Sequence, residues 1–176
     1  MLKKLSDTRY QIDAKLSWAF ISKPETRLKY KKDDEYETVY RVNGEFSKED
    51  LFELMMLRTT EGIGQDLKKD EKTGIVSFQF RRFVDVDTAT NEPVSKLVVK
   101  GPDGNPLEDG ILLGNGSEGV IAFALKPYSN DKTKHKVILE GVKITKLVIF
   151  EGGGGQAEND PVPENLFDDN NPDAAF

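Results

Sequence analysis

The chain has 176 residues, no cysteine and a formal net charge of −6, with 37% of its residues apolar and 32% charged. These values fit one soluble domain of ordinary size with a short extension, and they leave too few apolar residues for a second core. The absence of cysteine excludes a disulfide scaffold, a cysteine nucleophile and a thiolate metal site. A single histidine, His135, argues against a histidine-built zinc site or a serine-histidine-aspartate triad.

Signals for a membrane span or for secretion are also missing. The longest apolar runs, such as residues 120–125, are far shorter than the roughly 20 residues that cross a bilayer. Residues 1–6 contain two lysines but no apolar run behind them, so they do not resemble a secretory signal. We therefore expect a cytosolic protein.

Charge is distributed unevenly along the chain. Residues 151–176 contain seven acidic and no basic residues, so this end carries a net charge of −7 and the rest of the chain +1. Residues 1–32 hold nine basic and three acidic groups, whereas residues 33–73 hold six basic and twelve acidic groups. One surface can therefore be basic although the whole chain is acidic.

The first predicted elements are two strands, at residues 14–22 and 36–42. Leu16, Trp18 and Phe20 alternate in the first strand, so we expect them to share one face. The position of Trp18 between two apolar neighbours leaves open whether it packs in the core or stacks on a ligand. The second strand places these residues together on one face: Tyr36, Thr38, Tyr40 and Val42.

A single helix is predicted next. Ser47 is a typical N-cap residue, the acids of residues 49–50 fall in the first turn, and apolar residues recur at helical spacing until residues 59–62. We expect this helix to pack against one side of a small barrel.

The strand at residues 75–84 is predicted to have two different faces. Val76, Phe78 and Phe80 form the expected core face, which leaves the opposite face to Gln79, Arg81 and Phe83. Further strands are predicted at residues 96–100, 119–126, 136–140 and 142–150, with a turn at residues 102–105 and a bulge or tight turn at Gly141.

Together these elements predict a mainly β fold, an OB-fold-like antiparallel barrel with one packing helix, although periodicity alone does not separate it from a sandwich. Four glycines open residues 152–176, and the acidic, polar composition that follows predicts a disordered tail. We therefore expect a domain at residues 1–151 and a disordered acidic tail at residues 152–176.

Nothing in the sequence has the pattern of an active site, so we expect a non-enzymatic protein without metal or cofactor. Asp85 and Asp87 are typical of a solvated strand end, and a metal-dependent nuclease using them with Asp103 is a minor alternative. Residues 114–117 lack the ending of a phosphate-binding loop and predict a turn. His135 lies among lysines, which is typical of a surface loop.

Binding of a single nucleic-acid strand requires cations for the phosphates and exposed rings for the bases, and the sequence supplies both. The candidate contacts are Gln79, Arg81, Phe83, Lys126, Tyr128, Lys132, Lys134 and Lys136, with Trp18 and Tyr40 as further rings. The amino-terminal third adds Lys3, Lys4, Lys15, Lys23, Lys29, Lys31 and Lys32.

The acidic tail ends in an aromatic residue, Phe176. A tail that only solubilises gains nothing from this ring, whereas a docking peptide gains an apolar anchor beside a carboxylate. We therefore predict a partner-binding function for the end of the tail, with these residues: Asp168, Asp169, Asp173 and Phe176.

The chain resembles the single-stranded DNA-binding proteins of T7-like phages. The resemblance extends over most of residues 14–155, and its specificity lies in the order of these segments: 21–24, 39–42, 77–83, 97–99, 106–109, 113–117, 123–128, 137–139 and 147–148. It implies an OB fold, DNA contact by Tyr128, and phosphate contacts at two positions that here are Gln79 and Arg81. Gln79 departs from the basic residue of the family.

The resemblance further implies a protein that coats and protects single-stranded DNA during phage replication and recombination, in the cytoplasm of the infected bacterium. The family's tail competes with DNA and recruits the phage DNA polymerase and the primase-helicase, and homodimerisation is left open. The alternative is a β interaction or structural module that binds no nucleic acid and carries a solubilising tail.

Overall fold

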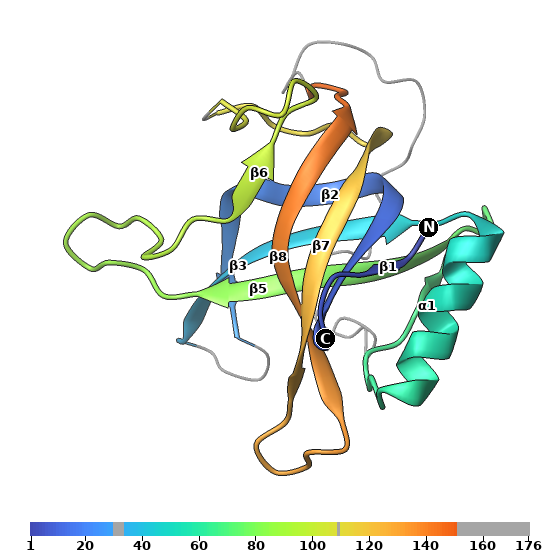
Figure 1. Cartoon of the computed structure of the whole chain (residues 1–176). Helices are drawn as coiled ribbons and strands as arrows, with labels where there is room; N and C mark the ends of the chain where they lie inside the picture. Colours follow the sequence, from blue (N-terminus) through green and yellow to red (C-terminus); the bar gives the residue numbers. More distant parts are fainter. Residues whose placement is uncertain (30–33, 109, 151–176) are drawn as a thin grey trace.

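The computed structural model describes residues 1–29, 34–108 and 110–150 (Figure 1). The tail predicted at residues 152–176, with its four candidate residues, lies outside this range, as do Lys31 and Lys32. The described residues form one helix and eight strands: β1 (Lys3–Lys4), β2 (Arg9–Leu28), β3 (Tyr36–Glu45), α1 (Lys48–Thr60), β4 (Lys68–Lys69), β5 (Val76–Val84), β6 (Val98–Lys100), β7 (Ser117–Pro127) and β8 (His135–Lys146).

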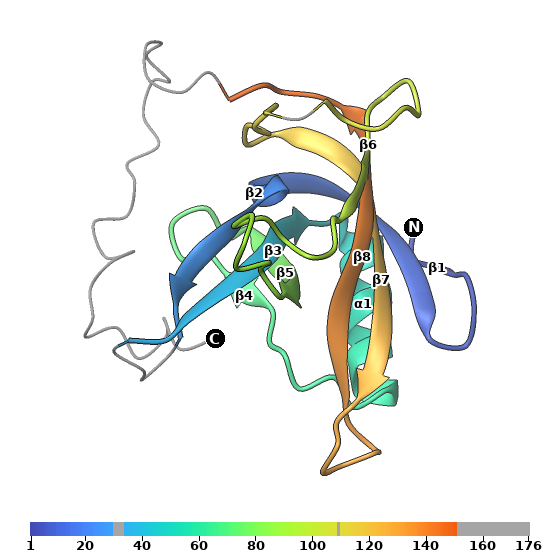
Figure 2. The same cartoon turned by 90° about the vertical axis from the view of Figure 1, so that its left-hand side faces the viewer.

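All eight strands belong to one curled sheet, in the order β4-β5-β3-β2-β7-β8-β6, with β1 paired to β2. β5 and β8 come close to each other without pairing, so the barrel is partly open, as OB folds are. Figures 1 and 2 show how the long β7-β8 hairpin projects beyond the rest of the sheet. The predicted OB-like, mainly β fold is confirmed, with one correction: β6 pairs with β8 in parallel.

β2 lies in the middle of the strand order and pairs on both edges. Its first part pairs with β7 and its later part with β3, and the register to β3 shifts between Ser17 and Phe20. This irregularity reverses the alternation of faces: Leu16 and Ile21 are both buried, whereas Trp18 is exposed and Phe20 lies opposite Arg41. The prediction that Leu16, Trp18 and Phe20 share a face is therefore wrong, since a bulge changes which side each residue occupies.

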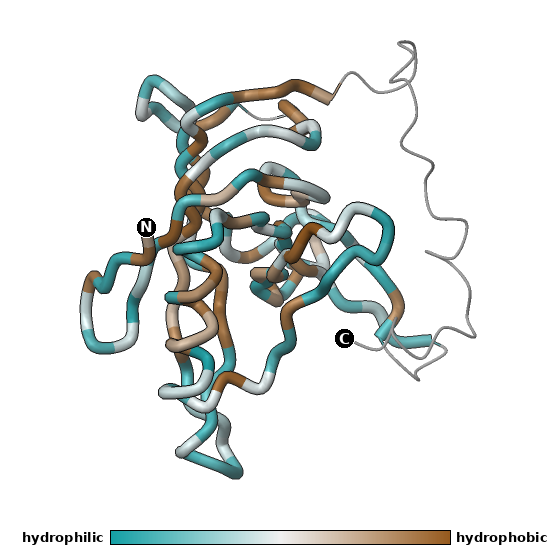
Figure 3. The backbone as a smooth tube through the Cα atoms, turned by 90° about the vertical axis from the view of Figure 1, so that its right-hand side faces the viewer, coloured by the Kyte–Doolittle hydropathy of each residue, from teal (hydrophilic) through white to brown (hydrophobic). Residues whose placement is uncertain are grey.

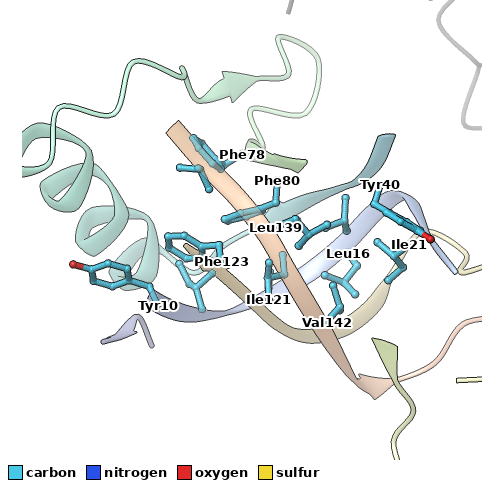
Figure 4. Close-up of a cluster of buried hydrophobic side chains, with 14 of the residues drawn as sticks. Tyr10, Leu16, Ile21, Tyr40, Phe78, Phe80, Ile121, Phe123, Leu139 and Val142 are labelled. Carbon is cyan, nitrogen blue, oxygen red and sulfur yellow. The ribbon is translucent and has the colours of Figure 1, made fainter. Parts of the chain in front are cut away.

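The core is built from the inward faces of β2, β3, β5, β7 and β8 (Figure 4). Phe80 lies at its centre, with ring centroids 5.0 Å from Phe78 and 5.1 Å from Phe123, and all three side chains are fully buried. Tyr10 stacks on Phe123 at 5.7 Å. Each such ring contributes roughly 1.5–3 kcal/mol through removal from water. The core face predicted for β5 is confirmed at Phe78 and Phe80.

The predicted helix and its N-cap are confirmed. α1 begins at Lys48, directly after Ser47. The Ser47 hydroxyl accepts a hydrogen bond from the backbone N–H of Asp50 at 3.1 Å. Leu54 is buried in the core and Leu57 packs against it, so the helix packs against one side of the barrel. Figure 3 shows both hydrophilic and hydrophobic residues along α1. No helix among the described residues is long and apolar enough to span a membrane.

β8 is one strand where the sequence predicts two. Opposite Ala122 and Phe123 the register of β8 shifts between Gly141 and Leu139, which confirms a bulge at the position of the glycine. A Cβ on Gly141 would lie 2.8 Å from the carbonyl oxygen of Val98, so glycine is needed where β6 approaches β8. Beyond β8 the chain returns along residues 112–114, through a bridge between Leu113 and Ile149.

Candidate nucleic-acid interface

The outward face of β3 and β5 carries the first group of candidate residues. Gln79, Arg81 and Phe83 alternate with the buried Phe78 and Phe80, so they lie on the side of the sheet away from the core. The antiparallel register places them opposite a matching row on β3: Asn43 faces Gln79, Arg41 faces Arg81, and Val39 faces Phe83. This face holds cations and a 51% exposed ring next to one another.

Arg81 is half-buried, and no described carboxylate lies within ion-pair distance of it. Its guanidinium lies over the Phe83 ring, 5.6 Å from the centroid. Burial, followed by the repulsion of the nearby Arg27, lowers the pKa of Arg81, while Glu37 and Tyr128 act in the opposite direction. The charge of Arg81 is therefore the least compensated on this face, and an incoming anion would stabilise it.

The other two arginines of this face are already paired. Arg41 forms an ion pair with Glu25 at 2.8 Å, and its guanidinium lies 4.8 Å from the centroid of the Phe20 ring. Arg27 pairs with Glu37 at 2.9 Å across the β2-β3 ladder. Glu37 and Glu25 neutralise these two arginines, so Arg27 and Arg41 contribute little net charge to the face. Their contribution is a fixed guanidinium position and, for Arg41, a flat surface against the Phe20 ring.

Tyr128 directly follows β7, in the β7-β8 hairpin. Its backbone N–H donates to the carbonyl of Lys134 at 3.0 Å, which fixes its position in the hairpin, and its side chain is 37% exposed. Tyr128 acts to raise the pKa of Arg81, against the lowering by burial, so the two side chains interact electrostatically across the fold. These two residues are 47 positions apart in the sequence.

The same hairpin carries the four predicted lysines. Lys126 and Lys136 face each other at its base and are both exposed, whereas Lys132 and Lys134 lie in its loop. Lys134 forms a 3.6 Å ion pair with Asp131, the one acid between residues 126 and 136. The hairpin segment therefore carries a net charge of +3, counted from four lysines and one aspartate with His135 neutral.

His135 anchors the base of the hairpin to the end of α1. Its Nδ1 lies 2.6 Å from the carbonyl oxygen of Glu61, and its backbone N–H donates to the carbonyl of Gly62 at 3.2 Å. These contacts give His135 a structural role, which fixes the direction in which the lysine-rich hairpin leaves the barrel.

The two remaining ring candidates, Tyr40 and Trp18, differ in their exposure to solvent. Tyr40 is 2% exposed and belongs to the core, where Figure 4 shows it beside Ile21. It is therefore not available for stacking on a base, and its inclusion among the DNA contacts is wrong, because the inward face of β3 carries it. Trp18 is 39% exposed, lies in the β2 bulge, and is not a core residue.

The amino-terminal lysines within the described residues lie in different parts of the fold. Lys3 and Lys4 lie in β1, Lys15 lies opposite Glu45, and Lys29 pairs with Glu35, which raises the pKa of Lys29.

The residues considered for catalysis have local roles. Asp87 accepts the backbone N–H of Ala89, and Asp103 binds Asn105 through both the backbone and the side chain, so each aspartate stabilises its own turn. Across residues 1–29, 34–108 and 110–150, no group of three or more histidine or acidic side chains is placed to hold a metal ion. The predicted turns at residues 102–105 and 114–117 are confirmed.

Comparison with known proteins supports the fold. Among solved structures the chain is similar to gp2.5, a single-stranded DNA-binding protein encoded by bacteriophage T7, with a TM-score of 0.52, 22% identity, and coverage of 84% of this chain and 91% of that one. The two chains share a fold. This result confirms the resemblance in fold that the ordered sequence segments predict.

A single-stranded DNA-binding protein from bacteriophage Enc34, in complex with single-stranded DNA, is also similar, with a TM-score of 0.48, 13% identity, and coverage of 82% of this chain and 93% of that one. No protein-family model matches the sequence, and a search of curated proteins finds no match.

Sequence reasoning missed three residues of the face, Phe20, Arg27 and Arg41. Phe20 was expected on the other face, and the bulge after Ser17 moves it. Arg41 lies in the predicted strand at odd parity beside Tyr40, so the alternation that places Tyr40 inside could have placed Arg41 outside. Arg27 lies in a part of β2 that the sequence pattern does not identify as a strand.

Proposed function

We propose that this protein binds single-stranded DNA without sequence specificity and coats it during phage DNA replication and recombination, in the cytoplasm of the infected bacterium. The observation that carries the proposal is the half-buried Arg81, which lacks a described carboxylate partner and lies over the exposed ring of Phe83, while Tyr128 in the β7-β8 hairpin supplies a second ring. A phosphate next to Arg81 and bases on the two rings would satisfy all three groups.

Lack of sequence preference follows from the same residues. Rings stack on any base, each stacked base contributes roughly 1–3 kcal/mol, and arginine and lysine contact phosphates that every nucleotide carries. The amide side chains of the face are engaged with protein, since Gln79 donates to the Asn43 side-chain oxygen at 3.2 Å. Gln79 carries no charge to neutralise a phosphate, and one N–H of its amide already donates to protein, so we propose it as a polar contact of the DNA strand.

The test measures the affinity of the full chain for labelled oligothymidylate and for a duplex of equal length, over a range of salt concentrations. We expect preference for the single strand and a log-log salt slope near −0.7 for each phosphate neutralised. Tyr128→Ala should weaken binding by roughly five- to a hundredfold. Tyr36→Ala, which removes a 65% exposed tyrosine from the start of β3, is the matched control and should bind as wild type.

Equal affinity of wild type and Tyr128→Ala would remove the stacking role of Tyr128. A salt-independent affinity, or equal binding of single strand and duplex, would remove the proposed function itself.

For residues 152–176 we propose competition with DNA for the same face, and recruitment of the phage DNA polymerase and the primase-helicase through Phe176 and the acids at positions 168, 169 and 173. The net charge of −7 after residue 150 complements the cationic hairpin.

Deletion of residues 152–176 should tighten DNA binding and abolish capture of these partners. Pull-down assays measure the capture by wild type, by the deletion variant and by Phe176→Ala. Weaker DNA binding after deletion would contradict the competition. Unchanged capture by Phe176→Ala would contradict docking through the ring.

A further inference from the structure

Trp18 has a backbone conformation that bulky residues rarely adopt. Its φ is 48°, in the left-handed region, and of the other described residues only Asn91 and five glycines have positive φ. The residue lies in the bulge where the β2-β3 register shifts between Ser17 and Phe20, and its side chain is 39% exposed. A glycine would fit this backbone without strain, so a large exposed ring here points to a use for the ring.

A turn between β6 and β7 holds this backbone in place. The Trp18 N–H donates to Oδ1 of Asn115 at 2.9 Å, and the N–H of Gly116 donates to the carbonyl of Leu16 at 3.1 Å. These two bonds straddle the bulge, one on each side of Ser17. Gly116, with φ 93°, supplies the third position of the turn, for which type II geometry requires a positive φ.

The residues that follow β8 form hydrogen bonds with this turn and with the residues just before it. Ser117 is fully buried, and its hydroxyl lies 2.9 Å from the carbonyl oxygen of Gly114 and accepts the N–H of Val148 at 3.0 Å. The N–H of Gly114 donates to the carbonyl of Val148 at 2.8 Å, and the N–H of Phe150 donates to Leu112 at 2.9 Å. The side chain of Asn115 is thus carried on a turn fixed by a buried network.

The strand register places Trp18 beside the candidate interface. It lies between the row of Ser17, Asn43 and Gln79 and the row of Phe20, Arg41 and Arg81. β2 and β5 flank β3, and neighbouring strands are about 4.8 Å apart, so the backbones of Trp18 and Arg81 are separated by roughly 10 Å across the sheet. A strand of nucleic acid crossing from β5 to β2 would pass from Phe83 to Trp18.

We propose that Asn115 is a positioning residue, which holds Trp18 in its left-handed conformation so that the indole stacks on a base of the bound single strand. The inference rests on the proposed function and adds to it a second stacking site, on β2, supported by the turn at residues 114–117. The ligand it takes is a nucleobase, recognised by its flat face and not by its edge.

The test uses the full chain and labelled oligothymidylate as the probe. Because Trp18 is the single tryptophan, its fluorescence reports on this site alone. Wild type should show indole quenching on binding. Asn115→Ala should reduce the quenching amplitude and weaken binding on the order of tenfold, the loss expected for one stacked base. Asn105→Ala, an exposed asparagine in the turn after β6, is the matched control and should behave as wild type.

Two further variants separate positioning from general damage. In a Trp18→Leu background, Asn115→Ala should cause no additional loss of affinity, since the ring that it positions is gone. Asn115→Asp keeps the acceptor oxygen, so without DNA its indole emission and anisotropy should match those of wild type. Circular dichroism and thermal melting identify any variant that fails to fold.

The outcomes distinguish this inference from the function on which it rests. If wild type binds but Asn115→Ala binds and quenches identically, the positioning role is overturned and the proposed function stands. An equal loss in the Trp18→Leu background would also overturn it, because Asn115 would then act through another group. If wild type itself fails to bind the oligonucleotide, the proposed function fails first.

Discussion

Replacing Arg81 by glutamine separates the function of the outward face from its stability. The guanidinium of Arg81 is half-buried, lies over the Phe83 ring at 5.6 Å, and has no described carboxylate within ion-pair distance. Arg81→Gln keeps a polar side chain of similar reach and removes the charge. We expect weaker binding to single-stranded DNA with little change in the free energy of unfolding.

The size of each effect follows from these contacts. A hydrogen bond between a charged donor and a phosphate contributes about 1.5–3 kcal/mol, so the dissociation constant should rise roughly 10- to 150-fold. Loss of one phosphate contact should make the log-log salt slope shallower by about 0.7. For stability, the lost cation-ring contact of about 0.5–1 kcal/mol is offset by relief of the charge's desolvation, which leaves a melting temperature within about 4 °C of wild type.

The assay compares Arg81→Gln with Arg82→Gln, the neighbouring arginine on the other face of the same strand. Arg82 donates to the Ser95 hydroxyl at 3.3 Å and lies opposite Tyr40, so its replacement should leave the DNA salt slope unchanged. Binding to labelled oligothymidylate at several salt concentrations gives affinity and slope together, and thermal melting gives stability. Equal slopes for wild type and Arg81→Gln would refute the assignment of a phosphate to Arg81.

Two further substitutions test the neighbours of this site. Glu25→Gln releases Arg41 from its 2.8 Å ion pair, so DNA affinity and the steepness of the salt dependence should rise while stability falls by up to about 3 kcal/mol, because a partly buried charge loses its partner; unchanged affinity would show that Arg41 does not reach the DNA. Ser47→Ala removes the N-cap of α1 and should cost about 1 kcal/mol, a shift of roughly 2–4 °C in thermal melting, without changing oligonucleotide affinity. An unchanged melting temperature would contradict the capping role of Ser47.

Much of the fold follows from patterns that are local in the sequence. The two faces of β5 are visible in the alternation of Phe78 and Phe80 with Arg81 and Phe83, and the start of α1 is visible in Ser47. Each of these depends on side chains a few positions apart, which is the range over which strand and helix periodicity applies.

The features that sequence reasoning left open or missed depend on distant segments, with the exception of Tyr40. The exposure of Trp18 requires a bulge stabilised by Asn115, which lies 97 positions away, and no pattern within residues 14–22 reports it. The same bulge moves Phe20 to the outward face. Tyr40 has the alternation of a core residue, and its proposed stacking role came from its ring alone and not from its position. Parallel pairing of β6 with β8 is equally non-local.

The outward face combines two arginines that are paired with carboxylates and one, Arg81, that has no described carboxylate partner. Glu25 and Glu37 neutralise Arg41 and Arg27 but also hold these guanidinium groups in fixed positions beside Phe20 and across the β2-β3 ladder. A phosphate that replaces either carboxylate would find its donor already oriented, so less side-chain entropy is lost on binding. In the proposed function, Arg81, which has no described carboxylate partner, and the +3 hairpin would supply the charge that attracts the strand first. Binding at this face would therefore depend on which arginines are free as well as on the net charge, and the steeper salt dependence expected for Glu25→Gln tests whether Arg41, once released, reaches a phosphate.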